Sequence, residues 1–360
     1  MEKKHRVAIL GSGNFGSAIC QIVGENVLRH PHQFEPVVKV WVFEEKVGDR
    51  KLTEVINTDH ENSKYLPGHK FPPTVQACSD PVEVVRGATL LVFVLPHQFA
   101  ATLCQKIRDH ISAGARAISL LKGMSVSEDG RSPVLLSSFL SQALSVHAPL
   151  DVSCLSGANI AEEVARGPLS EATIGCHAPA IGELWKQVFD CPRYRVSVSP
   201  DVAGVELCGA LKNIVALAAG ICDGLKTGGN TKAAIIRIGF REMMNFTAQF
   251  FKGVEPGTFF ESCGIADLIV TCFSGRHRKV AAAHSETGKP FSQLEAEMLN
   301  GQKLQGTHTA QEVHQILSAN RLADAFPLFT AVYRIVFEEA SPVTLFSIDL
   351  PHLSFIRSKL

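Results

Sequence analysis

The stretch Val7-Ala8-Ile9-Leu10-Gly11-Ser12-Gly13-Asn14-Phe15-Gly16 decides the fold. It begins as a short apolar run typical of a buried strand, and its three glycines then follow the spacing G-x-G-x-x-G before a helix-compatible stretch. In such a motif Gly11 makes a tight turn, Gly13 lets a pyrophosphate approach the backbone, and Gly16 allows close packing of helix on strand. The free N–H groups at the start of the helix favour an anion. The pattern predicts a dinucleotide-binding βαβ unit.

Short β-branched runs alternate with helical patterns from this motif to Ser199. This alternation predicts an α/β fold of the Rossmann type, with a mainly parallel sheet covered by helices on both faces. The candidate strands are Arg6–Leu10, Val37–Phe43, Thr89–Leu95, Ala115–Leu121, Val152–Ser156, Glu171–Cys176 and Tyr194–Ser199.

The pattern changes near Pro200, after which long helical segments follow one another without a convincing strand. We therefore expect two domains, a dinucleotide-binding domain over residues 1–199 and an all-helical substrate domain over residues 200–360. The expected helices are Asp201–Leu225, Thr231–Phe251, a stretch around Phe259–Cys272, Thr307–Ala319 and Phe329–Glu339.

The composition narrows the class of protein. Of 360 residues, 46% are hydrophobic and 19% are charged, a balance that favours a globular core over disorder. The formal net charge is zero, so no overall field favours nucleic acid or an anionic membrane, although a small phosphorylated substrate needs only a few local cations.

The cysteines and the apolar runs predict no metal, disulfide or membrane span. The ten cysteines are scattered, form no C-x-x-C pair and have no zinc-ligand spacing, which indicates reduced thiols. No apolar segment precedes the first strand, so we expect no secretory signal. The most apolar run, Ile214–Cys222, is too short for a bilayer and is typical of a buried helix.

Glu44 and Glu45 are the acidic residues at the end of the second candidate strand. A carboxylate there can bind the adenosine ribose, and no arginine follows immediately to bind a 2′-phosphate, so the sequence favours NAD over NADP. The alternative is that one or both carboxylates simply lie in solvent at the strand end.

Lys212 stands out because it lies in a long run of apolar helix positions, next to Asn213. A lysine is costly to bury unless it is paired or neutral. It is either a side chain that extends to water from a helix edge, or a buried lysine with a lowered pKa that exchanges a proton with a carbonyl or alcohol.

A second polar group lies downstream. Asp267, in an apolar helix, is a candidate partner for Lys212, and Thr271 shares its helix face. The basic cluster Arg276-His277-Arg278-Lys279 follows a Ser-Gly turn. It is either a solvated basic loop or a phosphate clamp, since the arginine fork matches phosphate oxygens.

Over nearly its whole length the chain resembles the eukaryotic NAD-dependent glycerol-3-phosphate dehydrogenases. Several blocks in one order are more specific than any single motif. The blocks are GSGNFGSAI from Gly11, WVFEE from Trp41, KLTEVINTDHEN from Lys51, KYLPGHK from Lys64, VLPHQF from Val94, LLKG from Leu120, GANIAEEV from Gly157, ELCGALKN from Glu206, NTKAAIIR from Asn230, ESCGIADLI from Glu261 and NGQKLQG from Asn300.

The resemblance implies a role for particular residues in the interconversion of dihydroxyacetone phosphate and sn-glycerol 3-phosphate. Lys212 is the proton donor and acceptor, and Lys122 and Asp267 assist it. The substrate is bound by Lys122, Asn159, Asn213, Thr271, Arg276 and His277. NAD is bound by Gly11, Ser12, Gly13, Asn14, Phe15, Gly16, Phe43, Phe99, Ala161, Arg276, Lys303 and Gln305. A homodimer is also implied.

The chain departs from the family at His277, where relatives usually carry asparagine in Gly-Arg-Asn-Arg-Lys. Imidazole can still donate to phosphate, and its protonated form adds charge, so affinity becomes more dependent on pH. Two alternatives stay open: a related two-domain dehydrogenase with another substrate, such as 3-hydroxyacyl-CoA or 6-phosphogluconate, and a catalytically silent NADH-binding regulator.

Ser358-Lys359-Leu360 matches the peroxisomal import tripeptide, which is bound by a receptor. The match predicts a peroxisome-like organelle, a peroxisome or a glycosome, with a cytoplasmic pool as an addition. The alternative is a terminus that no receptor binds.

Overall fold

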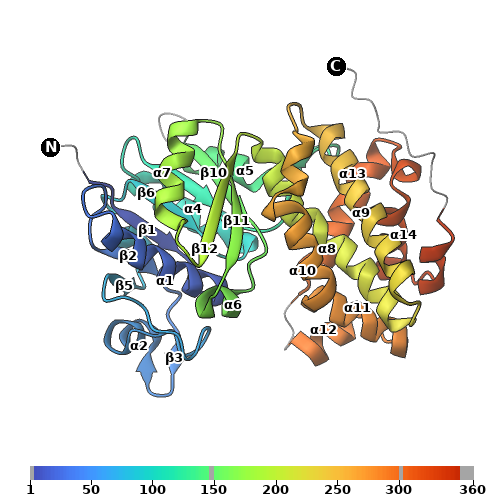
Figure 1. The fold of residues 1–360 in the computed structure, drawn as a ribbon, viewed down its shortest axis with the longest axis horizontal. Helices are drawn as coiled ribbons and strands as arrows, with labels where there is room; N and C mark the ends of the chain where they lie inside the picture. The colour runs from blue at the N-terminus through green and yellow to red at the C-terminus, as the bar shows by residue number, and fades with distance from the viewer. Residues whose placement is uncertain (1–3, 146–149, 300–302, 349–360) are drawn as a thin grey trace. The chain divides into compact units, whose positions relative to one another are not determined.

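The computed structural model describes residues 4–145, 150–299 and 303–348 (Figure 1). The chain divides into two compact units. The first comprises Met1–Lys122 and Leu136–Val202, and the second comprises Gly123–Leu135 and Ala203–Leu360. The expected division was a single boundary at residues 199–200, whereas residues 123–135 group with the second unit.

The first unit is built on an eight-stranded sheet in the order β12-β11-β10-β7-β6-β1-β2-β5. All neighbours are parallel except β10 and β11. From β5 to β10 the order is the 3-2-1-4-5-6 of the dinucleotide-binding fold. The bounds are β1 Val7–Leu10, β2 Val38–Trp41, β5 Val75–Cys78, β6 Leu90–Phe93, β7 Arg116–Ser119, β10 Asp151–Ser156, β11 Ser170–Gly175 and β12 Tyr194–Ser199.

The predicted fold class is confirmed, and all seven predicted strands lie in this sheet. Strand β5, at the edge of the sheet beyond β2, was not predicted from the sequence. It is only four residues long, it follows Pro72-Pro73, and Gln76 in its middle is exposed. An edge strand with a half-polar pattern gives too weak a hydrophobic signal to stand out.

Helices cover both faces of the sheet, because side chains alternate along each strand. Ile9 and Val92 pack with residues of α1, α6 and α7, whereas Leu10 and Leu91 pack with residues of α3, α4 and α5. The bounds are α1 Asn14–Arg29, α6 Ala161–Arg166, α7 Pro179–Phe189, α3 Pro81–Val85, α4 Ala100–Ile107 and α5 Leu136–Leu144.

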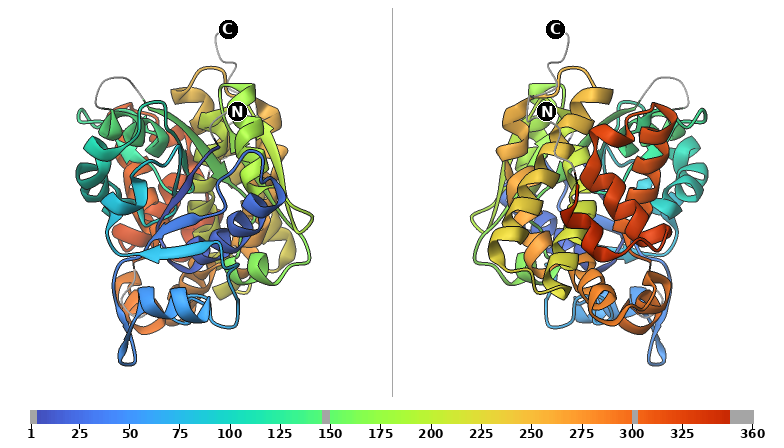
Figure 2. Two further views of the ribbon diagram at one scale, coloured as in Figure 1. Left: turned by 90° about the vertical axis from the view of Figure 1, so that its left-hand side faces the viewer. Right: turned by 90° about the vertical axis from the view of Figure 1, so that its right-hand side faces the viewer.

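A small hairpin, β3 (Lys46–Val47) with β4 (Arg50–Lys51), lies beside α2 (Leu52–Asp59) at the lower end of the first unit in both views of Figure 2. It follows the end of β2, where the chain leaves the sheet. These residues lie beyond the predicted strand, and the two-residue strands are too short to give a sequence signal.

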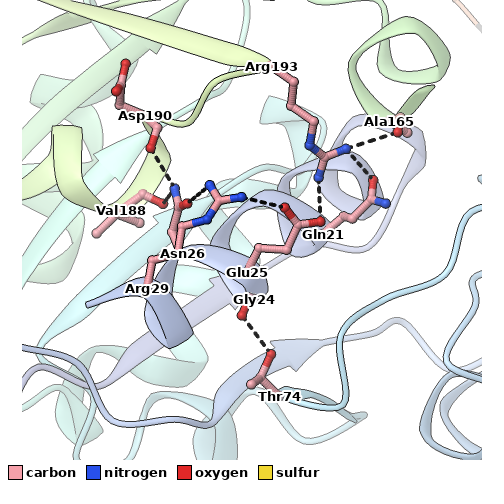
Figure 3. A network of polar contacts seen from close by, with 10 residues as sticks. All are labelled: Gln21, Gly24, Glu25, Asn26, Arg29, Thr74, Ala165, Val188, Asp190 and Arg193. Atoms are coloured by element: carbon pink, nitrogen blue, oxygen red, sulfur yellow. Dashed lines mark hydrogen bonds and ion pairs between the residues drawn. The ribbon is translucent and has the colours of Figure 1, made fainter. Parts of the chain in front are cut away.

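Buried polar contacts bind α1 to segments far along the chain (Figure 3). The amide nitrogen of Asn26 donates to the carbonyl oxygens of Val188 (3.0 Å) and Asp190 (3.2 Å). Arg193 donates to Glu25 (2.7 Å) and to the carbonyl oxygen of Ala165 (3.1 Å). Because α1 begins at the glycine motif, these contacts hold the motif in place.

We expect replacement of Asn26 by alanine to destabilise the first unit by about 2–4 kcal/mol. The change leaves two carbonyl oxygens without donors beside a fully buried position. Tryptophan fluorescence in urea measures the effect, since both tryptophans, Trp41 and Trp185, lie in this unit. Arg166→Ala, at an exposed pair with Glu162, is the control and should cost less than about 1 kcal/mol.

The second unit is helical around α8 (Val202–Gly224), in which residues 204–222 are all buried. In the described ranges α8 is the one helix whose length and composition would suffice to cross a membrane, and its apolar window is entirely buried, as in the core helix of a globular domain. The other helices are α9 Gly229–Phe250, α10 Asp267–Ser274, α11 Arg276–Thr287, α12 Phe291–Leu299, α13 Gln305–Ala319 and α14 Pro327–Phe337.

Glycines bring α11 and α9 close to α8. A Cβ on Gly220 would lie 2.3 Å from the carbonyl oxygen of Arg278, and one on Gly224 would lie 2.3 Å from that of Ala282. On α9, a Cβ on Gly239 would lie 2.6 Å from Val215. The α8–α11 contact therefore admits no side chain at either glycine of α8.

The segment Gly123–Leu135 contributes a hairpin, β8 (Ser125–Val126) with β9 (Pro133–Val134), to the second unit. It lies against α13, where Asn320 just after the helix donates to the carbonyl oxygen of Arg131 over 2.8 Å.

Candidate active site

The glycine motif lies where the strand order reverses, at the carboxyl end of β1 beside β6. Gly11 has φ +124°, and a Cβ there would lie 2.4 Å from the carbonyl oxygen of Val94. A Cβ on Gly16 would lie 2.5 Å from the carbonyl oxygen of Gly11. The fold itself therefore requires glycine at both positions.

Gly13 differs, because a Cβ there would meet no protein atom within 4 Å. Gly13 is the N-cap of α1, which has no capping side chain and no acidic residue in its first turn. The loop is thus suited to bind an anion at the backbone N–H groups, and the approach of a pyrophosphate explains why the motif has glycine at Gly13. These residues fit the diphosphate of NAD.

Neighbouring segments brace the loop. Asn62 donates to the carbonyl oxygen of Ser12 (2.8 Å), and Asn14 donates to that of Tyr65 (2.7 Å). Phe15 packs against the core, and Ala161 is buried at the start of α6.

Phe43 and Phe99 are large exposed rings in the same unit, with 71% and 56% of their surface accessible. Phe43 follows the end of β2, and Phe99 ends a short 3-10 turn after β6. Two aromatic rings left in solvent after the strands that flank β1 are suited to contact with flat cofactor groups.

Both candidate ribose ligands have protein partners. Glu44 accepts hydrogen bonds from the hydroxyl (2.7 Å) and amide (3.2 Å) of Thr53. Glu45 accepts from Lys64 (2.7 Å) and from the hydroxyl of Tyr65 (2.6 Å). Partial burial raises the pKa of Glu45, but these hydrogen bonds outweigh it and hold the pKa below its usual value. The two carboxylates therefore bind residues of the segments that lie near the glycine motif.

Lys122 and Asn159 come together because they follow adjacent parallel strands, β7 and β10. The Lys122 Nζ lies 3.5 Å from the carbonyl oxygen of Gly157. The Asn159 amide, oriented with its nitrogen toward acceptors, donates to the carbonyl oxygen of Glu171 over 3.2 Å and contacts the Tyr194 hydroxyl.

In the second unit, Lys212, Asp267 and Thr271 form a buried polar cluster between α8 and α10. The Lys212 ammonium is paired with the Asp267 carboxylate, and the two side chains are only 6% and 2% exposed. Lys212 also donates to the Thr271 hydroxyl over 2.8 Å, and that hydroxyl donates to the carbonyl oxygen of Asp267 over 2.6 Å. The predicted pairing is confirmed, and a side chain extending to water is excluded.

The local fold positions this cluster by an unusual turn. A single π-helical turn, Ser262–Ala266, directly precedes Asp267. A Cβ on Gly264 would lie 2.0 Å from the carbonyl oxygen of Phe259, so only glycine fits there. Single π-helical turns occur frequently at functional sites.

Asn213, His277 and the start of α13 also meet. A Cβ on Gly306 would lie 2.7 Å from the His277 ring and 3.1 Å from the carbonyl oxygen of Asn213. His277 is buried, and its ring therefore fills the space beside Asn213 and Gly306. Of the cofactor candidates here, Gln305 begins α13, and Lys303 pairs with Glu295 at 2.9 Å.

The basic cluster is the first turn of α11 and not a loop, so the loop expectation is wrong. Arg276, His277 and Arg278 occupy the helix start, after an N-cap at Gly275. Helices usually begin with acidic residues, because the N-terminus carries a partial positive charge. Because cations are unfavourable in a first turn, the sequence did not indicate that a helix begins here. The same cations are suited to bind an anion.

Asp223, which lies at the end of α8, was not predicted as a site residue from the sequence. It accepts hydrogen bonds from Arg278 and from Lys232, the latter at 2.8 and 3.0 Å. No spacing in the sequence points to contacts between such distant residues. Within the described residues, no group of three or more His, Cys, Asp or Glu side chains could hold a metal ion.

A nucleotide fingerprint in one unit and a buried lysine–carboxylate pair in the other define a nicotinamide-dependent dehydrogenase. Comparison with known proteins gives the family. The pattern described as NAD-dependent glycerol-3-phosphate dehydrogenase N-terminus matches residues 6–181, and that described as its C-terminus matches residues 201–347. The chain belongs to the NAD-dependent glycerol-3-phosphate dehydrogenases.

Individual relatives agree. The cytoplasmic NAD(+) glycerol-3-phosphate dehydrogenases of Rattus norvegicus and Homo sapiens are 53% and 52% identical over 334 residues, which is 92% of this chain and 94% of each relative. The solved structure of the Saccharomyces cerevisiae glycerol-3-phosphate dehydrogenase has a TM-score of 0.90 at 41% identity, over 96% of this chain and 99% of that one. Membership of this family shows that the chain has NAD-dependent glycerol-3-phosphate dehydrogenase activity.

Proposed function

We propose that the chain interconverts dihydroxyacetone phosphate and sn-glycerol 3-phosphate with Lys212 as proton donor and acceptor. The buried cluster of Lys212, Asp267 and Thr271 is the observation that carries the proposal. The Asp267 carboxylate stabilises the ammonium form of Lys212, so the lysine carries a proton for a ketone oxygen. The Thr271 hydroxyl, fixed by its own hydrogen bond, holds the ammonium in position.

The direction of reduction illustrates the work of each residue. The glycine motif would hold NADH, and the bound cofactor would supply the hydride that reduces the ketone carbon. Lys212 donates a proton to the oxygen as its negative charge develops, and water restores the ammonium afterwards. In the reverse direction the neutral lysine takes the proton from the alcohol.

Cations hold the substrate in this proposal. Arg276 at the start of α11 binds the phosphate through its fork, with His277 and the helix N–H groups beside it. Lys122, Asn159 and Asn213 bind the polar atoms of the triose. Binding energy at the remote phosphate then orients the reacting carbon.

The experiment that tests the proposal follows NADH absorbance with purified protein and dihydroxyacetone phosphate, beside NADPH and unphosphorylated dihydroxyacetone. Fast oxidation that requires both NADH and the phosphate supports the proposal. If NADH binds and no phosphorylated triose is reduced, the chain is a silent NADH-binding regulator instead.

Localisation and assembly complete the proposal. The mammalian relatives are named cytoplasmic, whereas Ser358-Lys359-Leu360, which lies outside the described residues, matches a peroxisomal address. We propose import by the peroxisomal receptor wherever this tripeptide is the free carboxyl terminus. We also propose that the chain forms a homodimer. A fluorescent protein carrying the last residues should enter peroxisomes, and two residues appended after Leu360 should prevent entry. Light scattering measures the dimer mass.

A further inference from the structure

Two cations of the second unit, Lys232 and Arg278, converge on the single carboxylate of Asp223. Asp223 lies in the last turn of α8, Lys232 lies in the first turn of α9, and Arg278 lies in the first turn of α11. Three helix ends are therefore joined at one charged group.

The contacts are short and partly shielded from water. Lys232 donates to both oxygens of Asp223, at 2.8 and 3.0 Å, and Arg278 donates to one of them. The side chains of Asp223 and Arg278 are 23% and 31% exposed, and that of Lys232 is 11% exposed. Lys232 also lies 4.4 Å from the centre of the Phe273 ring, on α10. Hydrogen bonds from both cations keep the pKa of Asp223 below its usual value although burial raises it.

The backbone shows why the ion pairs of Asp223 matter for the position of α11. Gly220 and Gly224 allow α11 to contact α8 directly at Arg278 and Ala282. This contact sets how closely the two helices approach. The ion pair of Asp223 with Arg278 adds a side-chain constraint at the start of α11, two residues after Arg276.

We propose that Asp223 is a positioning residue for phosphate binding, acting through Arg278 on Arg276 and His277. This inference rests on the proposed function, in which the start of α11 binds the substrate phosphate. Asp223 touches no substrate in the proposal. It holds Arg278 away from the phosphate and fixes the first turn of α11, so that Arg276 meets the phosphate in one orientation.

The test replaces Asp223 by asparagine and measures KM and kcat with dihydroxyacetone phosphate. We expect KM to rise about tenfold or more, as for the loss of a charge-assisted hydrogen bond, with kcat changed less than about threefold. Inhibition by inorganic phosphate should weaken by the same factor, and kcat/KM for unphosphorylated dihydroxyacetone should stay unchanged. Glu297→Gln, at the exposed pair with Lys289 in the same unit, is the matched control.

The sign of the KM change separates positioning from a simple field effect. Removal of a negative charge near the phosphate site would by itself strengthen anion binding, so a lower KM would overturn the inference. An equal loss of activity with both substrates, together with a lower Tm, would show a merely structural role and would also overturn it.

A second variant keeps the test decisive if Asp223→Asn folds poorly. Arg278→Gln should also raise KM, and the double variant should be little worse than Asp223→Asn alone, because both changes break the pair of Asp223 with Arg278. Additive effects would contradict an action through Arg278. If the unaltered chain fails to reduce dihydroxyacetone phosphate, the proposed function fails instead.

Discussion

Alanine in place of Lys212 is expected to lower kcat for reduction of dihydroxyacetone phosphate by about three orders of magnitude, because proton transfer by a positioned side chain contributes roughly that much. The affinity for NADH should stay unchanged, since the glycine motif lies in the first unit whereas Lys212 lies in the second. Steady-state kinetics and NADH fluorescence titration measure the two quantities.

The same change removes the ammonium that pairs with the buried Asp267 carboxylate, which is expected to cost about 3–5 kcal/mol of stability. Lys212→Met combined with Asp267→Asn removes both charges and should recover much of that loss without recovering kcat. Lys289→Ala, at an exposed lysine of the same unit, is the control. Turnover within tenfold of the unaltered enzyme would contradict the role of Lys212.

The second large effect is expected at Arg276. Arg276→Ala should lower kcat/KM for dihydroxyacetone phosphate by about two orders of magnitude, since a bidentate charged contact to the phosphate is lost. The kcat/KM of Arg276→Lys should lie between those of the unaltered enzyme and Arg276→Ala, because lysine keeps the charge but lacks the forked guanidinium group. Activity on unphosphorylated dihydroxyacetone should fall much less, because that substrate has no phosphate for Arg276 to bind.

Arg334→Ala provides a matched control, because Arg334 is an exposed arginine of the same unit that pairs only weakly with Glu338, at 3.9 Å. It should leave both substrates unaffected. An equal loss of activity on the two substrates after Arg276→Ala would place Arg276 outside phosphate recognition.

The sheet could be predicted because its strands are buried on both faces and therefore form continuous apolar runs, as in Val7–Leu10 and Leu90–Phe93. Strand β5 and the start of α11 could not. The first is a half-exposed edge, and the second begins with cations where the helix dipole favours acidic residues.

The Lys212–Asp267 pair was predicted because each residue interrupts an apolar helix, and a buried charge needs a partner. Asp223 gave no such signal. It stands at the end of α8 beside Gly224, where a polar residue is ordinary, and its partners are set by how three helices pack. The roles of the site residues remain predictions.

The chain passes between its two units three times, after Lys122, after Leu135 and after Val202. During synthesis the β8–β9 hairpin therefore emerges before α13, the helix it packs against, and before strands β10, β11 and β12 of the sheet. A fragment that ends at Ser199 would carry this hairpin without its support. Exchange of the helical unit between relatives therefore requires residues 123–135 to be transplanted with it.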